Sequence, residues 1–272
     1  MQYILLTIAA LAASFLIGWL LMKLITRGKN KGLAFKVVVT VLIALGLQGA
    51  AGAIYLGSFY HALTSSDQFL QSEGEVEVTD IDEGYFFDGP GTDKAIIFYP
   101  GAKVETTAYS PMMHYLAAEG VDCFLVHMPA NMAILDTSAA DSILDRYDYK
   151  TWAIGGHSMG GAAAALYAAD NGDRVQGLIL LAAYPSKQIP DSVMIQSIYG
   201  DKDGVLEMDT YEENKKYWPM NYEEVVIPGG NHAGFADYGP QKGDGEAEIE
   251  PKEQQEMTVQ AILTFMENLQ ME

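Results

Sequence analysis

The pentapeptide Gly-His-Ser-Met-Gly at residues 156–160 constrains the fold of this 272-residue chain more than any other feature. It follows a short apolar, β-branched and aromatic run at 151–154, which predicts a buried strand. It precedes an alanine-rich run at 161–169, which favours a helix. A Gly-x-Ser-x-Gly motif between a strand and a helix predicts a sharp turn that exposes the hydroxyl of Ser158, with glycines where side chains would collide. The motif alone is weak evidence, so the prediction depends on the strand and the helix beside it.

Charge divides the chain into two parts with different predicted environments. Residues 1–66 contain five of the 16 basic residues and no acidic residue. Residues 67–272 contain the other 11 basic residues and all 36 acidic ones, a net charge of −25. A region with this much negative charge repels nucleic acid and anionic lipid headgroups, and its charge favours solubility. We therefore expect no nucleic-acid partner. The single cysteine, Cys123, excludes an intramolecular disulfide and lies in an apolar run, where it is predicted to be a small buried residue.

Two apolar segments predict a transmembrane helical hairpin over residues 1–60. Residues 1–22 and 37–60 are almost wholly apolar and long enough, at 1.5 Å per residue, to cross a hydrocarbon core about 30 Å thick. A secretory signal peptide fits the first segment poorly, because no basic residue precedes the apolar run and the run is too long. Small residues at every fourth position favour close helix packing, although incidental small residues on lipid-facing helices remain the alternative. They are Ala10, Ser14, Gly18, Gly49, Ala53 and Gly57.

The five early basic residues lie in or beside the connection between the two apolar segments and predict the orientation. They are Lys23, Arg27, Lys29, Lys31 and Lys36. The positive-inside rule places such a short loop in the cytoplasm. Both ends of the chain then lie outside, so we expect a two-pass integral protein of the cell membrane with its catalytic domain on the extracytoplasmic side. A polar linker is predicted at 61–75.

Residues 76–272 alternate short apolar runs with helical patterns. Strands are predicted at 76–78, 85–87, 95–99, 121–126, 151–154, 177–182, 193–199 and 225–227. Helices are predicted at 111–118, 139–145 and 161–169 and from residue 251 onward. Continuous apolar strands between helices predict an α/β domain whose mostly parallel sheet has helices on both faces. The sequence contains no metal-ligand spacing, so no metal and no cofactor is expected.

Two later strand ends supply the partners that a serine nucleophile needs. A serine hydroxyl becomes reactive when a positioned base takes its proton and an acid orients that base. His232 follows the last predicted strand and is the candidate base, with Asp203 as the candidate acid after the strand before it. Asp201 is the alternative acid, but Asp203 lies beyond the turn, where it can reach back to the imidazole. His127 also follows a strand, but it precedes Ser158 in the chain and is predicted only to line the substrate pocket.

Two backbone N–H groups are predicted to form an oxyanion hole, which stabilises the negative charge that develops during acyl transfer. Met159 follows the nucleophile at the start of its helix. Ala102 lies in the loop after the strand at 95–99, where Gly101 permits the turn. An ordinary Pro-Gly turn at the end of a strand is the alternative interpretation of this loop.

These motifs together resemble the α/β-hydrolase fold over residues 76–272. The segments at 98–104, 155–161 and 229–235 are similar to those of a bacterial branch of membrane-anchored or secreted hydrolases, distantly related to dienelactone hydrolases. In that branch the acid stands in Tyr-Gly-x-x-Asp-Gly, which matches residues 199–204, so the resemblance supports Asp203. The resemblance implies hydrolase activity. The chain departs from the branch in its two apolar segments, where one is more usual.

The loops predict an open site without a lid domain. Residues 183–191, between the strand that carries the acid and its predecessor, are too few to build a lid. Tyr184 and Tyr238 are predicted to line the pocket, although each is also compatible with ordinary packing. We therefore predict a serine hydrolase that acts on a small-molecule carboxylic ester or related acyl substrate through an acyl-enzyme. A peptidase, thioesterase or acyltransferase with the same triad, or a non-catalytic surface binding protein on this scaffold, remain the alternatives.

Overall fold

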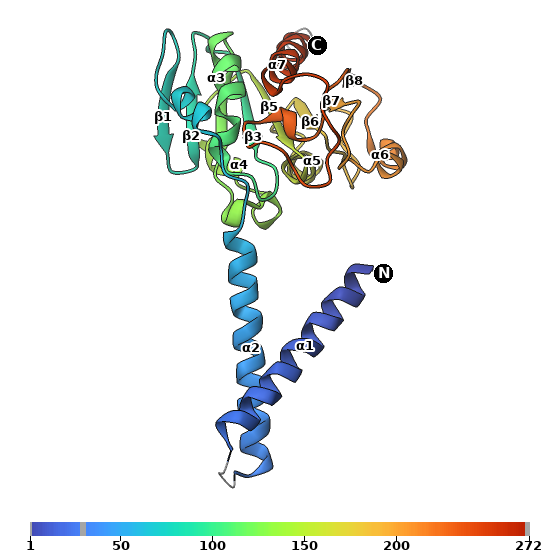
Figure 1. Cartoon of the computed structure of the whole chain (residues 1–272). Coiled ribbons are helices and arrows are strands. Elements are labelled where there is room, and N and C mark those ends of the chain that lie inside the picture. Colours follow the sequence, from blue (N-terminus) through green and yellow to red (C-terminus); the bar gives the residue numbers. More distant parts are fainter. Residues whose placement is uncertain (1, 28–30, 270–272) are drawn as a thin grey trace. The chain divides into compact units, whose positions relative to one another are not determined.

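The computed structural model describes residues 2–27 and 31–269, and its contacts divide the chain into two compact units, Met1–Ser58 and Phe59–Glu272 (Figure 1). The first unit consists of two helices, α1 (Gln2–Ile25) and α2 (Leu33–Gly57). By length and composition, α2 is able to cross a membrane, with a mean hydropathy of 2.2. The apolar stretch described within α1 is shorter, at Ala10–Ile25.

The contact between α1 and α2 uses only one of the two predicted rows of small residues. On α1, a Cβ atom on Gly18 would lie 2.8 Å from the carbonyl oxygen of Thr40, so this glycine permits the close approach. On α2, a Cβ atom on Gly49 or Gly57 would meet no atom within 4 Å among the described residues, so these two glycines do not mark the close approach. The side of α2 that contacts α1 contains Gln48, whose amide donates a hydrogen bond of 2.8 Å to the Ser14 hydroxyl.

The second unit contains one eight-stranded sheet in the order β1-β2-β4-β3-β5-β6-β7-β8. β1 and β2 pair antiparallel, as do β2 and β4, and every later pair is parallel, which confirms the mostly parallel sheet. The strands are β1 (Glu77–Ile81), β2 (Gly84–Asp88), β3 (Lys94–Tyr99), β4 (Asp122–Val126), β5 (Thr151–His157), β6 (Gly177–Leu181), β7 (Met194–Gly200) and β8 (Tyr222–Ile227).

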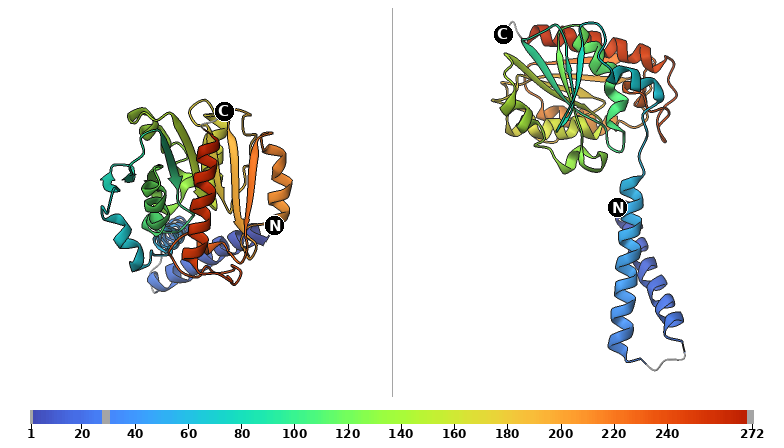
Figure 2. Two further views of the ribbon diagram at one scale, coloured as in Figure 1. Left: turned by 90° about the horizontal axis from the view of Figure 1, so that it is seen from above. Right: turned by 90° about the vertical axis from the view of Figure 1, so that its left-hand side faces the viewer.

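Helices cover both faces of this sheet (Figure 2). One face packs against α3 (Ser110–Ala118) and α7 (Pro251–Asn268). The other packs against α4 (Ala140–Arg146), α5 (Met159–Asp170) and α6 (Met208–Asn214). Alternation along β3 separates the two cores, since Ile96 and Phe98 face the first and Ala95, Ile97 and Tyr99 the second.

Tyr60, the last residue of the predicted hairpin, and the segment 61–75 predicted as a linker both belong to the second unit. The N–H of Tyr60 donates to the carbonyl of Lys103 at 2.7 Å, and the N–H of Glu105 donates back to the carbonyl of Tyr60 at 2.9 Å. A 3₁₀-helix at Thr64–Leu70 follows, and Ser66 within it is fully buried. These contacts attach the segment directly beside the loop that follows β3.

Candidate active site

Ser158 lies at the junction of β5 and α5, in the strained conformation expected of a nucleophile on a sharp turn. Its backbone dihedrals are φ 54° and ψ −122°, in a region that non-glycine residues rarely adopt. The turn needs its flanking glycines. A Cβ on Gly160 would collide with the carbonyl oxygen of Tyr99, and one on Gly156 would collide with the backbone of Gly160. The side chain of Ser158 therefore projects from a turn that the local packing enforces.

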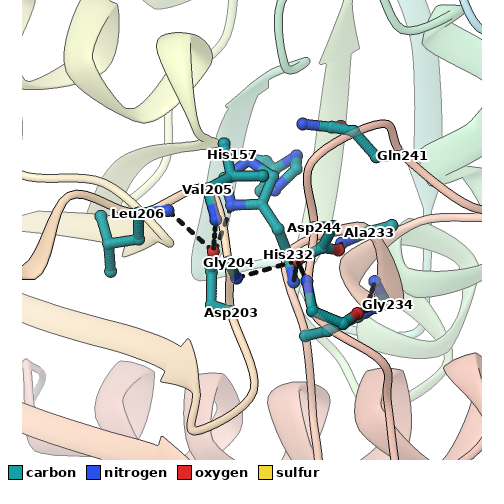
Figure 3. A network of polar contacts seen from close by, with 12 residues as sticks. His157, Asp203, Gly204, Val205, Leu206, His232, Ala233, Gly234, Gln241 and Asp244 are labelled. Atoms are coloured by element: carbon teal, nitrogen blue, oxygen red, sulfur yellow. Dashed lines mark hydrogen bonds and ion pairs between the residues drawn. The ribbon is translucent and has the colours of Figure 1, made fainter.

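Asp203 and His232 come together at the ends of neighbouring strands β7 and β8. The Nδ1 atom of His232 lies 2.8 Å from Oδ2 of Asp203, and both side chains are 2% exposed (Figure 3). The other carboxylate oxygen, Oδ1, accepts the N–H groups of Val205 and Leu206 at 2.8 Å each. These three bonds fix the carboxylate and make Nδ1 of His232 the hydrogen-bearing nitrogen, because the carboxylate can only accept.

Asp201 has a different role from Asp203. Its Oδ1 atom accepts the N–H of Gly229 at 2.7 Å, which ties the end of β7 to the loop after β8. The residue is exposed, and no hydrogen bond or ion pair found in residues 31–269 joins it to His232. Of the two candidate acids, the structure therefore brings only Asp203 to the imidazole.

The second ring nitrogen of His232 is not engaged by the described residues of the protein, and the residue lines a cavity together with Ser158. Nε2 is buried and has no hydrogen-bond partner within the described part of the chain, which leaves its lone pair available. His232 and Ser158 line the same cavity of about 270 Å³. A buried imidazole that has a carboxylate on one nitrogen and a free lone pair on the other is equipped to take a proton from a neighbouring hydroxyl.

The N–H group of Ala102 is available, whereas its neighbours on the chain are occupied. The N–H of Gly101 donates to Oη of Tyr109 at 3.0 Å, and that of Lys103 donates to the carbonyl of Asn131 at 2.7 Å. Among the hydrogen bonds found in residues 31–269, none uses the N–H of Ala102. Met159 is the first residue of α5, so its N–H also lacks a partner within the helix. Both N–H groups therefore lack a partner among the described residues; Met159 lines the cavity beside Ser158, whereas Ala102 is not among its lining residues.

The cavity beside Ser158 is small and mostly apolar. Its volume of about 270 Å³ lies at the lower limit for small-molecule sites, which span roughly 300–1,000 Å³. Small aliphatic side chains form its wall, and Tyr184 and Glu207 are the polar groups at its side. The lining residues are Ser158, Met159, Ala162, Ala182, Ala183, Tyr184, Val205, Leu206, Glu207 and His232. No group of His, Cys, Asp or Glu side chains in the described residues could hold a metal ion.

Of the three predicted pocket residues, only Tyr184 lines this cavity. His127 is exposed at the end of β4, with its ring 5.1 Å from that of Tyr85. Because β3 separates β4 from β5, that strand end is one position removed from Ser158. Tyr238 is buried, with its ring 5.5 Å from that of Tyr60 and its hydroxyl bonded to Gln241. The structure does not bring His127 or Tyr238 to the cavity.

Asp244 is a residue of the site that the sequence did not reveal. One of its oxygens accepts the N–H groups of Gly204 at 3.0 Å and His232 at 3.2 Å, and the other accepts the N–H of Ala233 at 2.8 Å. A single carboxylate thereby joins the loop that contains Asp203 and Gly204 to the loop that contains His232 and Ala233 (Figure 3). Its position in a glycine-rich loop offered no local signal for this role.

Comparison with known proteins agrees with the fold described above. Residues 95–256 match the model of the alpha/beta hydrolase family. No curated protein matches the chain. Among solved structures, Est1E from Butyrivibrio proteoclasticus is 15% identical with a TM-score of 0.50, over 73% of this chain and 100% of Est1E.

Two further solved structures show the same fold. A dienelactone hydrolase from Anabaena variabilis is 14% identical with a TM-score of 0.50, over 70% of this chain and 99% of its own. DcsB, solved in complex with its substrate analogue, is 12% identical with a TM-score of 0.54, over 71% of this chain and 99% of its own. The match to the family model spans more than half of the chain and confirms the resemblance noted in the sequence: the protein belongs to the α/β-hydrolase family.

Proposed function

We propose that this protein is a serine hydrolase that cleaves small carboxylic esters through an acyl-enzyme. The observation that carries the proposal is the shared cavity, which is lined by the strained Ser158 and by His232, whose Nδ1 is bonded to Asp203 and whose Nε2 has no partner among the described residues. This arrangement matches the roles of nucleophile, base and orienting acid in acyl transfer.

Each step of the proposed reaction uses one of these groups. His232 takes the proton of the Ser158 hydroxyl as its oxygen attacks the ester carbonyl. The N–H groups of Met159 and Ala102 stabilise the negative oxygen of the tetrahedral intermediate. His232 then protonates the leaving alcohol, and water attacks the acyl-enzyme with the same base. The Asp203 carboxylate holds the imidazole in one tautomer and stabilises its positive charge.

The cavity favours a small and mostly apolar acyl or alcohol group. Ala162, Ala182 and Ala183 contribute only methyl groups to the wall, yet the enclosed volume stays near 270 Å³. The connection between β6 and β7 contains no helix or strand that would cover the site. Short esters therefore fit the proposed site, whereas a long acyl chain would extend into solvent.

We further propose that α1 and α2 form a two-pass membrane anchor with the catalytic domain on the extracytoplasmic side. Many large apolar side chains on both helices are exposed, including Leu24 at 65%, Leu33 at 79% and Leu42 at 62%. A lipid environment would bury such a surface, which would be unusual on a soluble protein. The basic residues around the connection favour a cytoplasmic position for it.

The test of the catalytic proposal is a substrate panel with the full-length protein in detergent micelles. We expect p-nitrophenyl acetate and butyrate to be hydrolysed with a far higher kcat/KM than matched p-nitroanilides or acyl thioesters, and Ser158→Ala to abolish turnover. Preference for a thioester or an anilide would replace the ester assignment. Turnover that survives in Ser158→Ala would contradict the proposed nucleophile.

A further inference from the structure

We propose that Tyr109 and His157 form a buried positioning pair that keeps the oxyanion loop and the catalytic histidine in fixed relation. This inference rests on the proposed function, because it concerns the groups assigned there. Neither residue lines the cavity beside Ser158, so the pair acts on the reaction through its neighbours.

One end of the pair holds the loop that carries Ala102. The N–H of Gly101 donates to Oη of Tyr109 at 3.0 Å, and this same oxygen lies 2.8 Å from Nδ1 of His157. A Cβ atom on Gly101 would lie only 2.8 Å from each of these two side-chain atoms. The peptide that precedes Ala102 is therefore packed directly onto the Tyr109–His157 hydrogen bond.

The other end of the pair contacts the catalytic base. The ring centroids of His157 and His232 are 4.5 Å apart, and the ring of Phe235 lies 5.6 Å from that of His157. Tyr109 is fully buried and His157 is 1% exposed. His157 immediately precedes Ser158 in the chain. The buried contacts of the pair therefore connect the strand before Ser158, the imidazole of His232 and the loop that carries Ala102.

The hydrogen bonds also define the charge of His157. Oη of Tyr109 accepts from Gly101, and among the hydrogen bonds of the described residues Nδ1 of His157 is the acceptor within reach of its own hydrogen, so we assign the acceptor role to Nδ1. Burial, and secondly the nearby His232, hold the pKa of His157 well below its usual range. A neutral ring beside His232 does not oppose the positive charge that His232 gains when it takes the serine proton.

Loss of the pair should change kcat and leave KM nearly unchanged. Without Oη of Tyr109, the N–H of Gly101 has no acceptor and the peptide before Ala102 is free to rotate. The oxyanion exists only after attack, so a displaced donor weakens the transition state and leaves substrate binding intact. We expect Tyr109→Phe and His157→Leu each to lower kcat at least tenfold with KM within twofold.

The experiment measures kcat and KM for p-nitrophenyl acetate in full-length variants in detergent. His157→Asn tests the hydrogen bond itself, because an asparagine oxygen can replace Nδ1 as the acceptor, and it should keep kcat within threefold of the wild type. Tyr149→Phe is the matched control. It removes a tyrosine hydroxyl that donates a hydrogen bond of 2.6 Å to the buried Asp122. Asp122 begins β4 and Tyr149 precedes β5, whereas Ser158 follows the end of β5, so this variant should keep kcat within twofold.

The outcomes separate this inference from the proposed function. If the wild type shows no turnover that depends on Ser158, the proposed function fails and this inference fails with it. If that turnover exists but Tyr109→Phe retains a normal kcat, only the inference is wrong. Equal losses in Tyr109→Phe and Tyr149→Phe, or in His157→Asn and His157→Leu, would also overturn it, because they would indicate a general effect on stability.

Discussion

The substitution Asp203→Asn tests the triad while it leaves the local fold almost unchanged. The asparagine oxygen can still accept the N–H groups of Val205 and Leu206, which Oδ1 of Asp203 now accepts. The new amide nitrogen, however, replaces Oδ2 at 2.8 Å from Nδ1 of His232 and can only donate. The imidazole must then move its hydrogen to Nε2, the nitrogen that has to take the serine proton.

The expected loss follows from this change of tautomer. In serine proteases the equivalent exchange lowers kcat about 10⁴-fold, which corresponds to roughly 5.4 kcal/mol at about 1.36 kcal/mol per factor of ten. The Asp203–His232 pair is also enclosed, with both side chains 2% exposed, so we expect a loss of the same order. We expect the melting temperature to change little, because the backbone hydrogen bonds remain.

The assay compares kcat for p-nitrophenyl acetate in wild type, Asp203→Asn and Asp201→Asn, with circular dichroism to monitor folding. Asp201→Asn is the control, because that carboxylate accepts only the N–H of Gly229 among the hydrogen bonds in the described residues. It should cost less than about tenfold. If Asp201→Asn were the more damaging variant, or if folded Asp203→Asn stayed within tenfold of the wild type, the assignment of the acid would be refuted.

Three further predictions concern the oxyanion hole, the acid sensitivity and the topology. Ala102→Pro removes a backbone donor and should cost about 2.7–4 kcal/mol of transition-state stabilisation, measured as a 10²- to 10³-fold loss of kcat, whereas Ala102→Ser should have little effect. The pKa of His157 is lowered by folding, so the unfolded state binds its proton more readily and stability falls as the pH drops below about 6.5. His157→Asn should therefore make the unfolding free energy less sensitive to acid, by at most about 1.4 kcal/mol per pH unit below about pH 6.5, as measured by denaturant titrations at pH values from 7.5 to 5. In intact cells, a cysteine introduced as Asn30→Cys should resist a membrane-impermeant maleimide and Ser72→Cys should react, against a low background because Cys123 is buried.

Each of these predictions has a result that would contradict it. A folded Ala102→Pro enzyme with normal kcat would place the second oxyanion donor elsewhere. Identical acid slopes for wild type and His157→Asn would mean that His157 is not held neutral by the fold. The reverse labelling pattern would place the catalytic domain in the cytoplasm.

The sequence predicted the α/β architecture because its signals are local. The apolar runs matched the eight strands to within a few residues, and the Gly-x-Ser-x-Gly motif predicted a strained turn that the structure contains at Ser158. The relation between Ser158, Asp203 and His232 could also be anticipated, because residues that follow parallel strands meet at one edge of the sheet. The short helix α6 was missed, since Tyr211 is the only buried residue in its polar sequence.

The features that the sequence could not predict depend on distant contacts. Tyr109 reaches Gly101 and His157 from the turn before α3, and no local pattern marks that approach. The predicted role of His127 assumed that its strand end adjoins the nucleophile, but the strand order places β3 between them. Tyr238 follows the base closely in the chain, yet its ring turns inward to pack against Tyr60.

The most direct test of the central claim is to label the full-length protein with a fluorophosphonate and map the adduct by mass spectrometry. A serine activated by a histidine and an aspartate reacts with such probes, whereas ordinary serines do not. We predict one phosphonate adduct per chain, on Ser158, that is absent from Ser158→Ala and strongly slowed in His232→Ala. A folded wild-type protein that forms no adduct, or forms one at another residue, would contradict the assignment of Ser158 as the nucleophile.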